Sequence, residues 1–145
     1  MSVAIVANPL AGRGRGAKIA QATKELLTAQ KVDFQLLFTE HPGHAIELAH
    51  EASKNHELVA ALGGDGTCRE VLEGIWTSSA TLGIIPGGTG NDYARGLGVP
   101  RQIEPALEAL LQGQEVALDV GLENETVFGQ MASIGFSANV LEHVN

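Results

Sequence analysis

The sequence predicts an α/β domain with three layers and a mostly parallel sheet. Two stretches carry this prediction, because Leu58 to Trp76 and Thr81 to Pro100 each run from a short apolar strand through glycines into a helix start. The opening apolar stretch, Val3 to Ala7, enters a glycine-rich turn in the same way. Strands that alternate with helices in this order are typical of a parallel sheet covered by helices.

Hydrophobic periodicity predicts the elements in order. The expected strands are 3–7, 32–39, 58–62, one beginning near Thr81, 115–120 and 126–134. The expected helices are about 17–30, one whose apolar face is Ala45, Leu48, Ala49 and Ala52, one from Thr67, one from Asn91-Asp92, one marked by Ile103 to Leu111 and ended by Gly113, and one over 135–144.

Length and composition indicate one globular domain, since 44% of the 145 residues are hydrophobic and 18% are charged. The net charge of −8 argues against nucleic acid as a partner. A single cysteine, Cys68, excludes an internal disulfide and suits a reducing compartment. No apolar run approaches the ~20 residues of a membrane-spanning helix, so we expect a cytoplasmic protein.

The turn Gly63 to Thr67 (GGDGT) is expected to bind an anion such as phosphate, because it precedes a helix start whose N–H groups point outward. Thr67 and Glu70 have the spacing of a capping box, which predicts that the helix starts at Thr67. The apolar face of this helix is expected at Cys68, Val71, Leu72, Ile75 and Trp76.

Asp65 lies inside this phosphate-binding turn, where a carboxylate would be repelled by a polyanion unless a cation lies between them. A divalent metal would supply that cation, so Asp65 suggests a metal nucleotide. The alternative is that Asp65 is only a turn residue that tolerates an unusual backbone angle. The sequence leaves both interpretations open.

The second stretch has the same order of strand, glycine turn and helix start, since a strand runs into Gly87 to Gly90 and then into Asn91-Asp92. In an α/β sheet, ligands bind outside the carboxyl ends of the strands, so both turns are expected to face one ligand. Basic residues are concentrated in or just after the glycine turns, which fits a bound polyphosphate, although solvated helix-end charges are the alternative. They are Arg13, Arg15, Lys18, Arg69 and Arg95, five of nine basic residues.

Other nucleotide motifs do not fit. Gly12, Gly14 and Ala17 satisfy G-x-G-x-x-A after a strand, as in the dinucleotide fingerprint. We reject it because its acidic residue should close the second strand, whereas Asp33 opens that strand. No Walker G-x-x-x-x-G-K-[ST] loop is present, and the H-x-x-H spacing at 41–44 has no nearby cysteine and contains a Pro-Gly turn, which disfavours zinc.

Four motifs together resemble the catalytic domain of the diacylglycerol kinase family, in particular bacterial soluble lipid kinases. They are NPLAGRG at Asn8 to Gly14, GGDGT at Gly63 to Thr67, GTGNDYAR at Gly88 to Arg95, and the triplet Asp119-Val120-Gly121. GGDGT alone is similar to turns in NAD kinases and 6-phosphofructokinases, whereas GTGND followed by an aromatic residue, Ala and Arg is more specific to lipid kinases. The resemblance implies a Rossmann-like three-layer domain related to the NAD kinase and phosphofructokinase folds.

The resemblance also implies roles for individual residues. Thr39, at the end of the second strand, would contact the nucleotide, or alternatively its hydroxyl caps the next helix. Asp65 would hold Mg²⁺, and Asp119 would have an essential polar role, so these two are the expected catalytic residues. The residues expected to bind the nucleotide are Asn8, Gly12, Arg13, Thr39, Gly63, Gly64, Asp65, Gly66, Thr67, Glu70, Gly88, Thr89, Gly90, Asn91 and Asp92.

The implied reaction is phosphoryl transfer from Mg-ATP to the hydroxyl of diacylglycerol or a similar lipid, giving phosphatidate. Residues 1–145 would be the nucleotide-binding catalytic domain, while the family's second, β-rich domain and its general base map to no residue here. We therefore expect a chain that binds ATP but is catalytically incomplete, in a protein that meets lipid at the inner face of the membrane. An NAD kinase-like phosphotransferase and a non-catalytic nucleotide-binding module are the alternatives, and a homodimer is left open.

Overall fold

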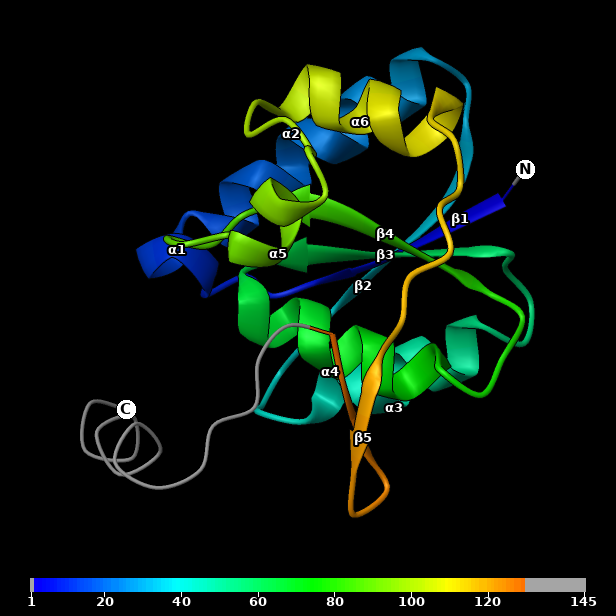
Figure 1. Ribbon diagram of the computed structural model, residues 1–145. Coiled ribbons are helices and arrows are strands. Elements are labelled where there is room, and N and C mark those ends of the chain that lie inside the picture. Colours follow the sequence, from blue (N-terminus) through cyan, green and yellow to red (C-terminus); the bar gives the residue numbers. More distant parts are fainter. Residues whose placement is uncertain (1, 130–145) are drawn as a thin grey trace.

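The computed structural model describes residues 2–129 and shows a four-stranded sheet between helices (Figure 1). The strands of this sheet are β1 (Ser2–Ala7), β2 (Asp33–Phe38), β3 (Leu58–Gly63) and β4 (Thr81–Pro86). The helices are α1 (Ala11–Gly14), α2 (Gly16–Ala29), α3 (His44–Ala52), α4 (Asp65–Ile75), α5 (Asp92–Gly96) and α6 (Ile103–Gln112). A separate antiparallel hairpin of β5 (Gly121–Glu123) and β6 (Thr126–Phe128) follows.

The four strands of the main sheet are parallel and lie in the order β2-β1-β3-β4, which confirms the predicted α/β class. The chain moves from β1 to β2 on one side and returns to β3 on the other side of β1. This reversal is a topological switch point, and such points leave a crevice at the carboxyl ends of the strands. The turns after β1 and β3 border this crevice, so the topology alone indicates where a ligand would bind.

Both faces of the sheet are covered, because nearly every residue of β1 and β3 is buried. Successive side chains point to opposite faces, so each strand contributes to two cores. Val6 and Ala61 pack in the core beside α3 and α4, whereas Ile5 and Leu62 pack in the core beside α2 and α6. The helix pairs lie on opposite sides of the sheet, which gives the three predicted layers (Figure 1).

The apolar face predicted for the helix after β3 is confirmed except at its last residue. Cys68, Val71, Leu72 and Ile75 are buried. Trp76 is 43% exposed, so its predicted place on that face is wrong. The reason is that α4 ends at Ile75 and Trp76 is only its C-cap residue, where the side chain leaves the packed face.

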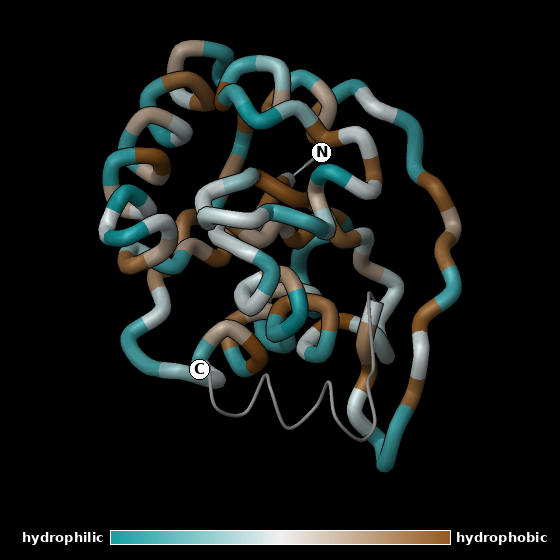
Figure 2. Tube along the Cα trace, turned by 60° about the vertical axis from the view of Figure 1, so that its left-hand side comes forward, coloured by the Kyte–Doolittle hydropathy of each residue, from teal (hydrophilic) through white to brown (hydrophobic). Residues whose placement is uncertain are grey.

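The strand predicted over 115–120 is wrong. Residues 114–120 have no regular secondary structure, and the segment leading to β5 alternates between apolar and polar residues along the outside of the domain (Figure 2). Val116 is 71% exposed and Leu118 is 51% exposed, because no strand or helix of the described part of the chain covers the apolar side of the alternation. The strand predicted over 126–134 is confirmed for Thr126–Phe128, whereas its later part and the predicted helix 135–144 lie outside the described residues.

Candidate functional site

The first glycine turn joins β3 to α4 at the carboxyl edge of the sheet. Gly64 is the N-cap residue, with an extended backbone (φ −95°, ψ −167°), and no side chain caps this helix. The N–H of Cys68 bonds back to the turn, donating to the carbonyl oxygen of Gly64 at 3.1 Å. The amides of Gly66 and Thr67 belong to the first helical turn, whose N–H groups have no partner within a helix and can bind an anion.

The capping box predicted for Thr67 and Glu70 is wrong. Thr67 lies inside α4, and its hydroxyl packs over Gly63, where an added Cβ would be 2.4 Å from Thr67 Oγ1. Glu70 instead accepts a hydrogen bond at 3.1 Å from the N–H of Gly43, in the loop before α3. The pattern failed because glycine is also an acceptable N-cap residue, so the helix begins earlier than the first side chain able to cap it.

The second glycine turn follows β4 and is closed by its own side chain. Asn91 is the N-cap residue of α5, with left-handed backbone (φ 55°), a conformation that asparagine tolerates better than most residues. Its Oδ1 accepts the N–H of Gly88 at 2.9 Å, and its Nδ2 donates to the carbonyl oxygen of Gly88 at 2.9 Å. The predicted helix start at Asn91-Asp92 is confirmed, and Asn91 is buried.

The two turns lie against each other, as the neighbouring strands predicted. The N–H groups of Gly87 and Gly88 donate to the carbonyl oxygen of Gly63 at 2.8 Å and 3.1 Å. A Cβ added to Gly88 would lie 2.4 Å from the Cα of Gly64, so these backbones approach too closely for any side chain at Gly88. Gly64 and Gly88 are therefore required for the contact between the turns, where Gly63 and Gly87 also lie close together.

Asp65 connects the starts of α4 and α5. Its Oδ1 accepts the backbone N–H of Tyr93 at 2.8 Å. Its Oδ2 faces Gly90, where an added Cβ would lie 3.3 Å from Asp65 Oδ2 and 3.9 Å from Asp92 Oδ1. Burial, with the Asp65 charge as a smaller cause, raises the pKa of the Cys68 thiol to about 12. Cys68 is thus a core thiol, as predicted, rather than a nucleophile.

The turn after β1 reaches the same edge. Gly12 (φ 60°, ψ 38°) and Arg13 (φ 61°, ψ 44°) distort α1, and the left-handed conformation of Arg13 costs about 1 kcal/mol for a non-glycine residue. A Cβ added to Gly12 would lie 2.4 Å from the carbonyl oxygen of Gly87. Arg15 Nε donates to the carbonyl oxygen of Gly12 at 3.0 Å and stabilises this turn. Three glycine turns therefore meet, after β1, β3 and β4.

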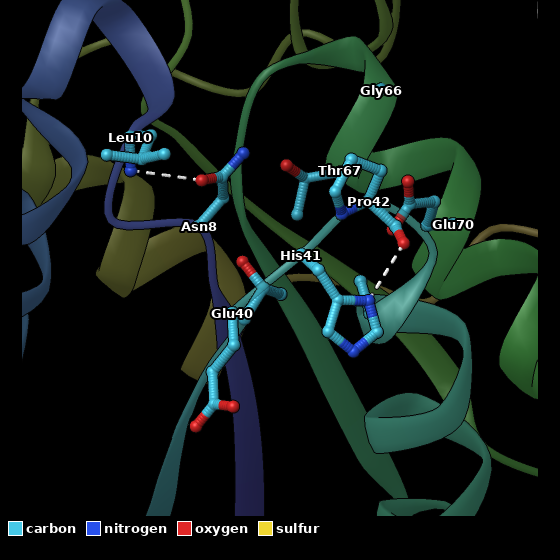
Figure 3. A pocket seen from close by; sticks show the side chains of 10 residues that line it. Asn8, Leu10, Glu40, His41, Pro42, Gly66, Thr67 and Glu70 are labelled. Carbon is cyan, nitrogen blue, oxygen red and sulfur yellow. Dashed lines mark hydrogen bonds between the residues drawn. The ribbon is translucent and has the colours of Figure 1, made fainter.

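A cavity of about 340 Å³ lies at the carboxyl ends of β1 and β2 beside the start of α4, with a size typical of small-molecule sites (Figure 3). Five of the residues expected to bind a nucleotide line it: Asn8, Thr39, Gly66, Thr67 and Glu70. The sequence did not predict the other lining residues, which are Leu10, Glu40, His41, Pro42 and Ala45. We call this space the first cavity.

The other predicted nucleotide residues do not line the first cavity. They are Gly12, Arg13, Gly63, Gly64, Asp65, Gly88, Thr89, Gly90, Asn91 and Asp92. Gly12, Gly63, Gly64 and Gly88 form the contacts between the turns, whereas Arg13, Thr89 and Gly90 are exposed. The glycine motifs thus divide into residues that line a cavity and residues that hold the turns together.

A second cavity, of about 270 Å³, lies beside α5. Its lining residues are Asp92, Tyr93, Gly96, Leu97, Leu118, Asp119 and Gly129. Asp119, which the sequence analysis assigned to the site, is therefore near Asp92 and not in the first cavity. Burial raises the pKa of the Tyr93 phenol, and the neighbouring Cys68 adds to this effect. The lining combines two exposed carboxylates with the apolar side chains of Leu97 and Leu118.

The basic residues near the turns have different surroundings. Arg69 forms an ion pair with Glu73 at 2.9 Å on the outer side of α4, which fits the alternative of a solvated helix charge. Arg95 pairs with Asp92 at the start of α5. Lys18 is exposed on α2. Among residues 2–129, no group of three or more His, Cys, Asp or Glu side chains could hold a metal ion by itself.

Comparisons with known proteins agree with this arrangement. A family profile described as "Diacylglycerol kinase catalytic domain" matches residues 2–122. A Klebsiella pneumoniae protein named "Probable lipid kinase YegS-like" is 34% identical over 135 residues, which cover 90% of this chain and 46% of that protein. A diacylglycerol kinase of Staphylococcus saprophyticus is 36% identical over 115 residues, covering 76% of this chain and 38% of that protein.

The fold is also similar to solved structures. A crystal structure of a diacylglycerol kinase from Bacillus anthracis matches with a TM-score of 0.77 and 34% identity, covering 88% of this chain and 45% of that chain. The chain therefore spans less than half the length of these relatives.

Proposed function

This chain belongs to the diacylglycerol kinase catalytic domain family, and we propose that it is the ATP-binding part of a lipid kinase. The proposed reaction transfers the γ-phosphate of ATP to the hydroxyl of diacylglycerol or a similar lipid, giving phosphatidate for phospholipid biosynthesis. One observation carries this proposal. The first-turn residues of α4 line a cavity together with Asn8 and Thr39, which the family resemblance assigns to the nucleotide.

We assign the nucleoside of ATP to the first cavity. Leu10, Pro42 and Ala45 give this cavity an apolar surface against which a base can lie. The side chains of Thr39 and Glu70 add polar groups that can bind ribose hydroxyls or the edge of the base. This combination of an apolar lining with a few polar groups is typical of small-molecule sites.

We assign the phosphates to the N-terminal turn of α4, because Gly66 and Thr67 line the first cavity and their amides lie at the positive end of the helix dipole. Mg²⁺ commonly binds through one or two carboxylates together with substrate phosphates. The carboxylates of Asp65 and Asp92 both lie beside Gly90, so these two residues could hold the ion. When bound there, Mg²⁺ would neutralise charge on the phosphate oxygens. Asp65 also fixes the start of α5 through the Tyr93 amide.

We assign the acceptor lipid to the side of the second cavity. Asp65 bonds to Tyr93, which lines that cavity, and directly precedes Gly66, which lines the first. A γ-phosphate held near Asp65 would thus lie between the two cavities. Leu97 and Leu118 offer apolar contacts to a lipid, and Asp119 could orient its hydroxyl. Residues 2–129 contain no helix able to span a membrane. We propose that the protein is cytoplasmic and meets the acceptor lipid at the inner face of the membrane.

We also propose that this chain binds Mg-ATP without turning over lipid. Deprotonating a lipid hydroxyl requires a base within hydrogen-bond reach. Among the described residues that line the second cavity, the carboxylates are Asp92 and Asp119, and the third ionisable group, the Tyr93 phenol, keeps its proton because burial raises its pKa. Asp92 is paired with Arg95, and Asp119 is assigned an orienting role. The general base would belong to the second, β-rich domain that the family resemblance implies.

Calorimetric titration of the 145-residue chain with Mg-ATP tests the proposal. We expect saturable binding that weakens about fivefold when Thr39→Ala removes a polar group of the first cavity. Thr28→Ala is the matched control, because Thr28 lies on α2 away from the first cavity and its hydroxyl donates to the carbonyl oxygen of Lys24 in the same helix. It should bind as the wild type does.

A parallel assay offers diacylglycerol and NAD with labelled ATP to the chain. Absence of Mg-ATP binding would refute the nucleotide site. Phosphatidate formed by this chain would refute its catalytic incompleteness, and labelled NADP would favour the NAD kinase alternative over a lipid acceptor.

A further inference from the structure

One wall of the first cavity is the loop from Thr39 to Gly43, between β2 and α3. Thr39, Glu40, His41 and Pro42 all line the cavity, and Figure 3 labels the last three. The last sheet bond of this segment is that of the Thr39 N–H, which donates to the carbonyl oxygen of Ala7 at 2.9 Å. Beyond Thr39 the wall leaves the sheet. The His44 N–H donates to the carbonyl oxygen of His41 at 3.2 Å within it, and side-chain contacts tie it to α3 and α4.

Two side-chain acceptors hold the backbone of this loop, one near each end. Glu70 Oε1 accepts the N–H of Gly43 at 3.1 Å, which ties the end of the loop to α4. His44 Nδ1 accepts the N–H of Glu40 at 3.1 Å, which ties the beginning of the loop to the first residue of α3. The His44 contact therefore fixes the segment that directly follows Thr39.

The two histidines of this segment have opposite requirements. His44 Nδ1 can accept the Glu40 N–H only while that nitrogen carries no proton. His41 Nδ1 lies 3.0 Å from the carbonyl oxygen of Pro42, and only a protonated nitrogen can donate there. The rings are stacked, with centroids 4.6 Å apart and planes 9° from parallel. Loss of the lone pair on His44 would break the contact with Glu40 and bring positive charge against the His41 ring.

The charged groups around His44 oppose one another. The positive end of the α3 dipole disfavours an imidazolium at the first helical position, and so does the stacked His41 when it is charged. Glu40 in the loop, Glu47 in the first turn of α3 and Glu70 on α4 favour it. Imidazole in general changes charge between about pH 5 and 8, so the contact between His44 Nδ1 and the Glu40 N–H is one that pH can break.

We propose that His44 is a positioning residue, whose neutral imidazole holds the Thr39–Gly43 wall in the form that binds a nucleoside and whose protonation releases this wall. The inference rests on the proposed nucleotide site. It adds that the affinity for the nucleoside part, but not for the phosphates, depends on the charge of one histidine outside the cavity lining.

The test measures binding of Mg-ATP and of Mg-tripolyphosphate, which has no nucleoside, to the whole chain at pH 8 and pH 5.5. His44→Ala removes the acceptor, whereas the Oδ1 of His44→Asn places a non-titrating acceptor near the position of Nδ1. We expect His44→Ala to bind Mg-ATP about tenfold more weakly than the wild type at pH 8, and His44→Asn to bind within about twofold of it. Mg-tripolyphosphate should bind equally to all three.

The pH dependence is read against His44→Asn, because this comparison cancels the titration of ATP itself. Between pH 8 and pH 5.5 the wild type should lose about tenfold more affinity for Mg-ATP than His44→Asn does. His50→Asn is the matched control, since His50 is exposed further along α3 and should retain the wild-type profile. Equal binding by His44→Ala and the wild type at pH 8, or equal pH profiles for the wild type and His44→Asn, would overturn the inference.

The loop contact has a readout that needs no ligand. The chemical shift of the Glu40 amide should titrate with the His44 ring in the wild type and be flat with pH in His44→Asn. A flat Glu40 amide in the wild type would overturn the inference even if Mg-ATP binds. Failure of the wild type to bind Mg-ATP at pH 8, with a titrating Glu40 amide, would instead refute the proposed nucleotide site and with it the consequence for affinity.

Discussion

The turn after β3 and the turn after β4 have similar glycine motifs but different structures. In the first, Gly64 begins α4 without any side-chain cap, and Gly66 and Thr67 line the first cavity. In the second, Asn91 closes the turn through two hydrogen bonds to Gly88. The first turn therefore has backbone groups that no described side chain caps, as the proposed phosphate site requires, whereas the second turn uses its backbone groups to hold itself and its neighbour in place.

This difference teaches that a glycine motif can serve binding or packing, and that neighbouring side chains decide which. In the second turn, the Gly88 amide is shared between Asn91 Oδ1 and the carbonyl oxygen of Gly63. In the first turn, no side chain of the described residues caps the helix start, and Glu70 accepts the N–H of Gly43 instead. The second turn thus supports the first. Substitutions in the second turn should affect stability, whereas substitutions in the first turn should affect ligand binding.

The largest expected difference in stability between the two turns appears when a methyl group is added to one glycine of each. Gly88→Ala should destabilise the chain by about 3 kcal/mol, because its Cβ would lie 2.4 Å from the Cα of Gly64 and backbone cannot move aside cheaply. Gly66→Ala meets nothing within 4 Å and lies in a helix, so it should be neutral or stabilise by up to about 1 kcal/mol. Urea unfolding measures both, and equal changes would contradict the division between the turns.

A smaller loss of stability is expected when the clamp in the second turn is removed. Asn91→Ala should cost about 2 kcal/mol, because two buried hydrogen bonds are lost and alanine is strained at φ 55°. Asn91→Gly loses the same bonds without the strain, so it should cost about 1 kcal/mol less. If the two variants unfold at the same urea concentration as the wild type, Asn91 does not hold the turn.

The smallest effect on stability among the side-chain substitutions is expected at Asp65. A variant there separates the two roles that the sequence left open, a metal ligand and a turn residue. Asp65→Asn keeps an acceptor for the Tyr93 N–H, so its free energy of unfolding should change by less than about 1 kcal/mol. If Asp65 holds Mg²⁺, this variant should nevertheless lose the gain in ATP affinity that Mg²⁺ provides. Titration with ATP in the presence and absence of Mg²⁺ measures this gain, and an unchanged gain would leave Asp65 as a turn residue.

Much of the fold was predictable because its strands are short, apolar and separated by glycine turns. β1 and β3 are buried along their length, as their sequences predicted. The strand predicted over 115–120 failed because alternation describes a half-buried surface but does not supply a neighbouring strand. The capping box failed for a related reason, since its spacing is also satisfied inside a helix that glycine has already begun.

The site was predictable only in part. Asn8, Thr39 and Gly66, which the motif resemblance assigned to the nucleotide, line the same cavity because all three follow parallel strands at one edge, whereas their binding of a nucleotide stays a prediction. The loop contacts of Glu70 and His44 were not predicted, since an acceptor for the Gly43 amide 27 residues away leaves no local pattern. The H-x-x-H spacing at 41–44 was a real signal, but it marks stacked rings and a backbone contact rather than a metal site.

The central claim is that the first turn binds phosphate and the second supports it, and amide chemical shifts during titration with Mg-ATP test this most directly. The amides of Gly66 and Thr67 should shift strongly as the nucleotide saturates the chain, whereas the Gly88 amide, already bonded to Asn91 at 2.9 Å, should shift little. Saturation by Mg-ATP with unmoved Gly66 and Thr67 amides would contradict the account.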